Sequence, residues 1–175
     1  MLTTKIETER LILKVLTEGD AKELFDIFSD HEVMKYWNTE PWSSIYKAKS
    51  FIASSTEAMK KNMDVTLGIY LKETGQLLGK IMLFNYHKES KRAEIGFGII
   101  RTFWGKGIVL EAGNALVDHA FNILHLRRIE AEIDPDNISS SKALERLGFV
   151  KEGYLRQRWE VNGVVSDSAI YGLLA

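Results

Sequence analysis

Hydrophobic positions along the chain change their spacing several times, and each change predicts a new strand or helix. Runs of apolar and β-branched residues predict strands at 10–16, 65–71, 77–86, 92–100 and 128–133. Apolar residues three and four positions apart predict helices from Ala21 to Phe28, from Ser43 or Ser44 to about Met59, over about 107–124 and over about 138–147. Two further strands after Phe149 are joined by Asn162-Gly163, a strong signal for a two-residue hairpin turn.

The order of these elements limits the fold. Three strands between 65 and 100 follow one another through short turns, which predicts a meander. The strand, helix and strand between 92 and 133 predict a right-handed parallel crossover, because that handedness is nearly universal. We therefore expect a single mixed α/β domain over residues 1–175, with a strongly twisted sheet of about seven strands flanked by about four helices.

Composition and charge disfavour several classes of protein. The 175 residues carry a formal net charge of −1 at pH 7, so no basic excess favours nucleic-acid binding. The chain has no cysteine and its four histidines lack metal-ligand spacing, so we expect neither disulfides nor a metal site. No apolar run approaches the roughly 18 residues that span a bilayer, and the first ten residues do not resemble a signal peptide. These features predict a cytoplasmic protein without nucleic-acid or membrane partners. The sequence does not select between a monomer and a homodimer.

The strand at 92–100 carries an unusual face. Glu94, Gly96 and Gly98 alternate with apolar residues, so they lie together on one side of the strand. The two glycines let a ligand or another backbone approach closely beside the carboxylate. The alternative is a glycine pair that marks a bulge or bend, with Glu94 on a solvated face.

The turn after this strand predicts an anion site. Gly105 and Gly107 permit a tight loop whose amide groups converge where the next helix begins. Unpaired amides and the positive end of the helix dipole suit phosphate oxygens, and Lys106 adds charge. The turn lacks the P-loop pattern, and Gly96-Phe-Gly98 does not complete a dinucleotide fingerprint because Arg101 stands at its third glycine position.

Two motifs, taken as a pair, resemble those of a known enzyme family. The turn Phe103-Trp-Gly-Lys-Gly-Ile-Val-Leu-Glu-Ala112 resembles the acetyl-coenzyme A pyrophosphate loop of the GNAT N-acetyltransferases. It is most similar to the branch that acetylates N-terminal alanines of ribosomal proteins. Asn137-Ile-Ser-Ser140 followed by Leu144-Glu-Arg-Leu-Gly-Phe149 is similar to the second motif of that branch, and the resemblance extends from Glu9-Arg-Leu-Ile-Leu13 to the final hairpin. It implies an acetyl-coenzyme A-dependent enzyme that acetylates a primary amine, on a peptide N-terminus or a small molecule.

The resemblance also implies which residues hold the cofactor. They are Ile99, Ile100, Arg101, Trp104, Gly105, Lys106, Gly107, Ile108, Val109, Asn137 and Ser140. Asn137 is expected to bind the pantetheine arm, although an Asx turn after Pro135 explains it nearly as well. Val109 departs from the alanine or glycine of the family pattern, and its branched side chain is expected to crowd the pyrophosphate.

Acyl transfer to an amine requires a base, a stabilised oxyanion and a proton for the leaving sulfur. Glu94 is the candidate base because it shares a face with the glycines that admit substrate. A backbone N–H near Ile99 or Ile100 is expected to stabilise the oxyanion. Ser140 matches a serine that the resemblance implies as the acid or its water holder, and Tyr154 is the second candidate. The alternatives are an N-cap role for Ser140 and sheet packing for Tyr154.

Aromatic residues are the candidates for the acceptor pocket. Tyr36, Trp37 and Trp42 lie between the first two predicted helices, and Trp159 lies in the final hairpin. Core and sheet packing explains them equally well, and nothing in the sequence selects the acceptor.

A different class of function stays open. The short-helix tyrosine that protonates sulfur in many relatives is replaced here by Leu144, which together with Val109 favours a catalytically degenerate sensor of acyl-coenzyme A or a partner-binding module. A phosphate-binding domain without acyl chemistry is the third hypothesis.

Overall fold

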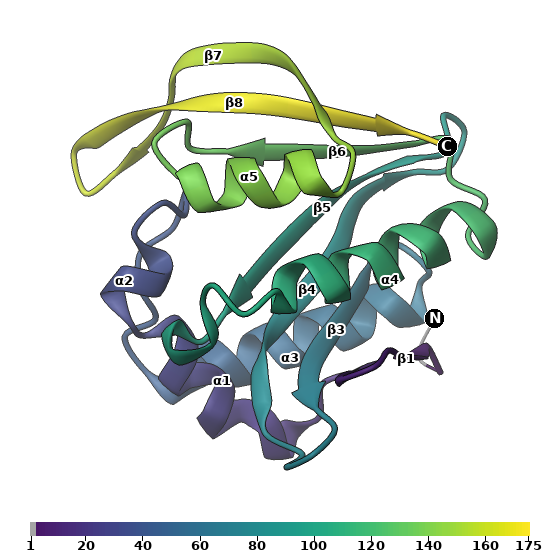
Figure 1. Cartoon of the computed structure of the whole chain (residues 1–175). Coiled ribbons are helices and arrows are strands. Elements are labelled where there is room, and N and C mark those ends of the chain that lie inside the picture. Colours follow the sequence, from purple (N-terminus) through teal and green to yellow (C-terminus); the bar gives the residue numbers. More distant parts are fainter. Residues whose placement is uncertain (1–2) are drawn as a thin grey trace.

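The computed structural model of this protein describes residues 3–175, in which one eight-stranded sheet carries helices on both faces (Figure 1). The strand order is β1-β2-β3-β4-β5-β6-β8-β7. The strands are β1 (Lys5–Glu7), β2 (Leu11–Lys14), β3 (Val65–Leu71), β4 (Leu77–His87), β5 (Arg92–Ile99), β6 (Arg128–Ile133), β7 (Val150–Val161) and β8 (Val164–Leu174). The helices are α1 (Ala21–Phe28), α2 (His31–Met34), α3 (Ile45–Lys60), α4 (Ile108–Asn122) and α5 (Ile138–Arg146), with 3-10 turns η1 (Glu18–Asp20) and η2 (Arg101–Phe103).

The predicted mixed sheet is confirmed, with β5 and β6 parallel and the other paired neighbours antiparallel. The predicted counts were low by one strand and one helix in the described residues, because β1 and α2 were not predicted. Both are single-turn or three-residue elements, too short to show a period of apolar positions.

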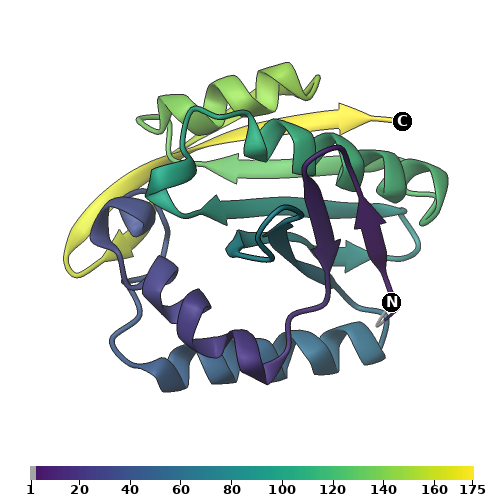
Figure 2. The ribbon, with the colours of Figure 1, turned by 60° about the horizontal axis from the view of Figure 1, so that its bottom comes forward.

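The helices cover the two faces of the sheet unevenly. Figure 2 shows α4 and α5 on one side of the sheet and α1 and α3 on the other. The larger buried cluster joins α4 and α5 to the strands, whereas the second cluster lies between α1, α2, α3 and the strands β3 and β4. On the α1 and α3 side, the two helices contact β3 and β4, and the cleft described below lies over the part of the sheet beyond them.

The two parallel strands separate along their length. β5 pairs with β6 only from Arg92 to Glu94, although β5 continues to Ile99. The Ile100 N–H donates to the Leu78 carbonyl at 2.7 Å. In an antiparallel pair the bonded residues alternate, so the backbone polar groups of Phe97 and Ile99 point away from β4, toward the opening beside β6. This edge of β5 can pair with an extended ligand.

No helix within residues 3–175 combines the length and apolar character needed to cross a membrane.

Candidate active site

The glycine turn forms a cluster of free amides where α4 begins. Gly105 and Gly107 both have positive φ, at 73° and 75°, a region that side chains rarely adopt. Gly107 is the N-cap of α4, and its carbonyl accepts the first helical bond, from the Glu111 N–H. Within the described residues, the N–H groups of positions 105–109 donate no hydrogen bond to a backbone or side-chain acceptor. Five donors at the positive end of a fifteen-residue helix fit the oxygens of a diphosphate.

Arg10 fastens this turn to the N-terminal strands. Its Nη1 donates to the Lys106 carbonyl at 2.9 Å, and its Nε lies 2.6 Å from a Glu111 carboxylate oxygen. Thr8 Oγ1 and the Arg10 N–H also donate to that carboxylate. Burial alone raises the pKa of Glu111, but the hydrogen bonds from Thr8 and Arg10 outweigh it and lower the pKa. Sequence reasoning missed Arg10 because its partners are a hundred residues away.

The side chains beside the glycine turn bond to neighbouring elements and do not cover its free amides. Trp104 Nε1 donates to the Ile99 carbonyl at 3.1 Å, which ties the turn to the end of β5. The Arg101 guanidinium pairs with Asp30 at 3.0 Å, so it is directed toward the start of α2. Val109 is partly buried and packs against the larger core cluster, and its expected crowding of the pyrophosphate stays a prediction.

A cleft of about 280 Å³ opens beside the separated strands. Its walls come from five regions far apart in the sequence. They are Tyr36, Trp37 and Asn38 after α2; Met82, Phe84 and Asn85 on β4; Glu94 to Phe97 on β5; Ala131 to Asp134, Asn137 and Ser140 from β6 to α5; and Arg158, Trp159, Ser166 and Ser168 on the final hairpin. The cleft therefore holds the candidate base, the open edge of β5 and the candidate acid together.

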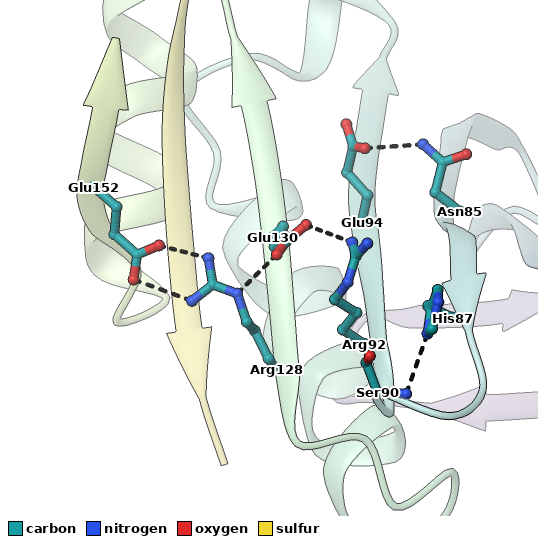
Figure 3. A network of polar contacts seen from close by, with 8 residues as sticks. All are labelled: Asn85, His87, Ser90, Arg92, Glu94, Arg128, Glu130 and Glu152. Carbon is teal, nitrogen blue, oxygen red and sulfur yellow. Dashed lines mark hydrogen bonds and ion pairs between the residues drawn. The ribbon is translucent and has the colours of Figure 1, made fainter.

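Glu94 lies in this cleft with its carboxylate partly buried. A register shift in β4 leaves Asn85 at a positive φ of 51°, and its amide Nδ2 donates to Glu94 Oε2 at 3.0 Å (Figure 3). Burial raises the pKa of Glu94, and the nearby carboxylates of Glu132 and Glu130 raise it further, while the Asn85 hydrogen bond lowers it. A carboxylate with a raised pKa is a stronger base.

A second carboxylate, Glu132, was missed by sequence reasoning. One of its oxygens accepts from Trp159 Nε1 at 2.6 Å, from Ser168 Oγ at 2.7 Å and from Arg158 Nε at 3.2 Å. Glu132 is on β6 beyond the last residue paired with β5, and it lines the cleft. Its spacing from Arg128 and Glu130 signalled a shared strand face, but the sequence did not indicate that this face borders the cleft.

Charged side chains bind the strands together below the cleft. Figure 3 shows Arg92 and Arg128 on either side of Glu130, and Arg128 reaching across β8 to Glu152. The Arg128–Glu152 pair passes over Gly172, where a Cβ atom would lie 2.6 Å from the Glu152 oxygens. This chain of alternating charge holds β5, β6 and β7 in place beside the opening.

The structure decides the N-cap of α5 and the availability of the Ile100 N–H, which the sequence left open. The N-cap of α5 is Asn137, whose Oδ1 accepts from the Ser140 N–H at 3.2 Å, so Ser140 is not the cap. The Ser140 side chain lines the cleft instead. The Ile100 N–H is already bonded to the Leu78 carbonyl, so the expectation that it stabilises an oxyanion is wrong, and Ile99 is left as the candidate.

Tyr154 lies outside the cleft, on β7. Its hydroxyl donates to Asp167 at 2.5 Å, and the same carboxylate accepts from the Gln157 N–H at 2.7 Å. This contact raises the pKa of Tyr154. Asp167 thus braces the register shift between Leu155 and Trp159, which brings Trp159 to the cleft. Tyr154 is not among the residues that line the cleft, and its hydroxyl is bonded to Asp167, so its role as an acid stays a hypothesis.

Of the four aromatic candidates for the acceptor pocket, three line the cleft and one is packed in the core. Tyr36, Trp37 and Trp159 line the cleft, whereas Trp42 packs in the second core cluster against Phe28.

The face of β5 that carries Gly96 and Gly98 is partly covered by aromatic side chains. A Cβ atom on Gly98 would lie 2.8 Å from both Phe28 and Trp37, so Gly98 admits aromatic side chains, while Gly96 lines the cleft.

Comparisons with known proteins agree with this geometry. The profile of the family described as an acetyltransferase (GNAT) domain matches residues 10–150. The uncharacterised N-acetyltransferase p20 of Bacillus licheniformis is 36% identical over 167 residues, which cover 95% of this chain and 94% of that protein. YdaF of Bacillus subtilis, provisionally named a ribosomal N-acetyltransferase, is 39% identical over 178 residues, covering 99% and 96%. The crystal structure of the microcin C7 self-immunity acetyltransferase MccE with acetyl-coenzyme A and AMP is similar at a TM-score of 0.87 and 26% identity, covering 96% of this chain and 94% of that one.

Proposed function

The chain belongs to the GNAT acetyltransferase family and is an N-acetyltransferase, and from that premise we propose that it moves an acetyl group from acetyl-coenzyme A directly to a primary amine within a ternary complex. The acceptor is an α-amine of a peptide or a small-molecule amine. The observation that carries the proposal is the set of free amides at 105–109, which lies at the end of the strand whose open edge lines the cleft.

Several residues of this chain fit acetyl-coenzyme A, which supplies the acetyl thioester. The amides of 105–109 would bind the diphosphate, with Trp104 and Arg10 holding the turn in shape. The open edge of β5 at Phe97 and the side-chain amide of Asn137 would bind the extended arm. MccE, which is similar over 96% of this chain, binds acetyl-coenzyme A, and this supports the assignment.

Glu94 is the proposed base. An α-amine with a pKa near ~8 is neutral about one time in ten at pH 7, and a lysine-like amine near ~10.4 far less often. A carboxylate whose pKa is raised by burial and by Glu132 can take the proton, directly or through water. The acidic surroundings also attract the cationic form of the amine into the cleft before the proton is removed.

The remaining two tasks fall to Ile99 and Ser140. The Ile99 N–H faces the opening and offers a donor to the negative charge that develops on the carbonyl oxygen. The Ser140 hydroxyl lines the same cleft and offers a proton, or holds a water that does, for the departing thiolate.

The test measures free thiol released from acetyl-coenzyme A across a panel of peptide N-termini and small amines. We expect amine-dependent release that falls at least about 100-fold in Glu94→Gln, the lower range for a positioned base. Glu89→Gln makes the same chemical change on an exposed turn and should retain full activity. Tight coenzyme A binding without release for any amine would instead identify a sensor.

A further inference from the structure

Lys80 is a buried lysine surrounded by four aromatic rings. It lies on β4 with 3% of its surface exposed. Its Nζ is 3.7 Å from the ring centre of Phe51, 4.5 Å from Phe28, 5.0 Å from Trp37 and 5.2 Å from Trp42. Lysine is almost never fully buried without a partner, so this position requires a physical explanation.

The sheet is shaped to hold this side chain. Lys80 is paired across β3 with Gly68 and across β5 with Gly98, so glycines flank it on both sides. The missing side chain at Gly98 is what lets Phe28 and Trp37 lie against the strand. Burial lowers the pKa of Lys80 to about 7, and no charged neighbour in the described residues offsets that burial. The four ring faces favour the ammonium form.

Trp37 belongs to both the ring cluster and the cleft. It lines the cleft, whereas Lys80 does not, and the Lys80 ammonium lies 5.0 Å from the centre of its ring. Gly98, on which Trp37 packs, is four residues along β5 from Glu94, about 13 Å at the usual strand rise. Glu94 and Trp37 line the same cleft, so an acceptor with its reacting nitrogen at Glu94 can place its tail against Trp37.

We propose that Lys80 determines the acceptor class, because its buried charge beside Trp37 admits amines with one ammonium group and disfavours those with a second cation in the tail. The inference rests on the proposed N-acetyltransferase function. Glu94 and Glu132 attract the first ammonium group at one end of the cleft, and Lys80 repels a second one at the other end. The favoured tail is thus uncharged and suited to stacking on the Trp37 ring.

The size of the effect follows from the distance. A group stacked about 3.5 Å beyond the ring would lie roughly 8 Å from Nζ. At an effective dielectric constant of about 20, two charges at that distance change affinity roughly 30-fold. Because the pKa of Lys80 is about 7, the neutral form limits this effect to about two-fold at pH 7. At pH 6 only about one molecule in eleven has lost that proton, and the effect is about eight-fold.

The experiment uses n-octylamine and 1,7-diaminoheptane, which match in length and differ by a terminal methyl or ammonium group. We compare wild type, Lys80→Met and Lys61→Met, which removes the same charge from an exposed helix end. At pH 6, the ratio of kcat/KM for diamine over monoamine should rise about eight-fold in Lys80→Met and stay within about two-fold in Lys61→Met. Lys80→Leu serves as a second variant, because replacing a buried charge with apolar atoms is usually tolerated.

Equilibrium binding of both amines, with coenzyme A present, separates this inference from the proposed function. If wild type releases no thiol with any amine, the proposed function fails, and the ratio of Kd values alone decides the role of Lys80. An unchanged ratio in Lys80→Met, an equal rise in Lys61→Met, a wild-type preference for the diamine, or no amine binding to any of the proteins overturns the inference.

Discussion

Replacing Gly107 by alanine tests the anion site most directly, because the chain contains its own matched control. Gly107 has a φ of 75°, and Gly75, in the distant β3–β4 turn, has a φ of 74°. A Cβ atom on Gly107 would meet only an Arg10 nitrogen at 3.5 Å, an ordinary contact, and one on Gly75 would meet nothing within 4 Å. The two substitutions therefore impose the same backbone strain without a steric clash.

That strain sets the expected change in stability. An L-residue in the left-handed region costs about 1–2 kcal/mol, and the smaller entropy of the unfolded alanine chain offsets part of this. A net loss of about 1 kcal/mol lowers the melting temperature of a chain of this size by roughly 2–4 °C. Both variants should show this same decrease in a thermal scan.

Coenzyme A binding should distinguish the two variants. Alanine keeps the N–H of position 107, but relief of its strained φ would turn that amide away from the diphosphate. Losing one hydrogen bond to a charged phosphate oxygen costs about 1.5–3 kcal/mol, so Gly107→Ala should raise the Kd for coenzyme A at least about ten-fold. Gly75→Ala should leave that Kd unchanged. Calorimetry or a ligand-induced thermal shift measures it. Equal affinities in the two variants, with equal losses of stability, would refute the assignment of the diphosphate to 105–109.

Three further outcomes test the cleft. Wild-type kcat/KM should rise with pH through the Glu94 pKa, because only the ionised carboxylate accepts a proton. Burial places that pKa above its usual 4.5, and Glu94→Gln should abolish this limb of the pH profile. Gly98→Ala places a Cβ 2.8 Å from Phe28 and Trp37; it should cost about 1–3 kcal/mol in a denaturant titration and raise the acceptor KM more than that of acetyl-coenzyme A. Tyr154→Phe should keep kcat within about two-fold, and a hundred-fold loss would restore Tyr154 as an acid.

Periodic patterns predicted the elements that carry the site. The strand at 128–133 and the helices after Ser44, Gly107 and Asn137 lie within a few residues of their predicted positions. Apolar spacing reports burial of one face, and that burial forms these elements. Asn162 and Gly163 both adopt positive φ, as the predicted hairpin turn requires.

Long-range contacts were beyond such patterns. Arg10 reaches Glu111 and the Lys106 carbonyl across about a hundred residues, and nothing local to Arg10 marks those partners. The register shift between Leu155 and Trp159, which brings Trp159 to Glu132, is held by one side chain, Asp167. Positions of this kind depend on the closed sheet rather than on neighbouring residues.

The pair of carboxylates in the cleft shows how surroundings divide the work between similar groups. One oxygen of Glu132 accepts hydrogen bonds from three donors, so this carboxylate holds Trp159, Ser168 and Arg158 in place. Glu94 receives one amide hydrogen bond, and burial raises its pKa, with a further rise from the charge of Glu132. Glu94 is therefore the carboxylate better suited to accept a proton. Removing the charge in Glu132→Gln should therefore lower the Glu94 pKa and move the rising limb of the pH profile to lower pH.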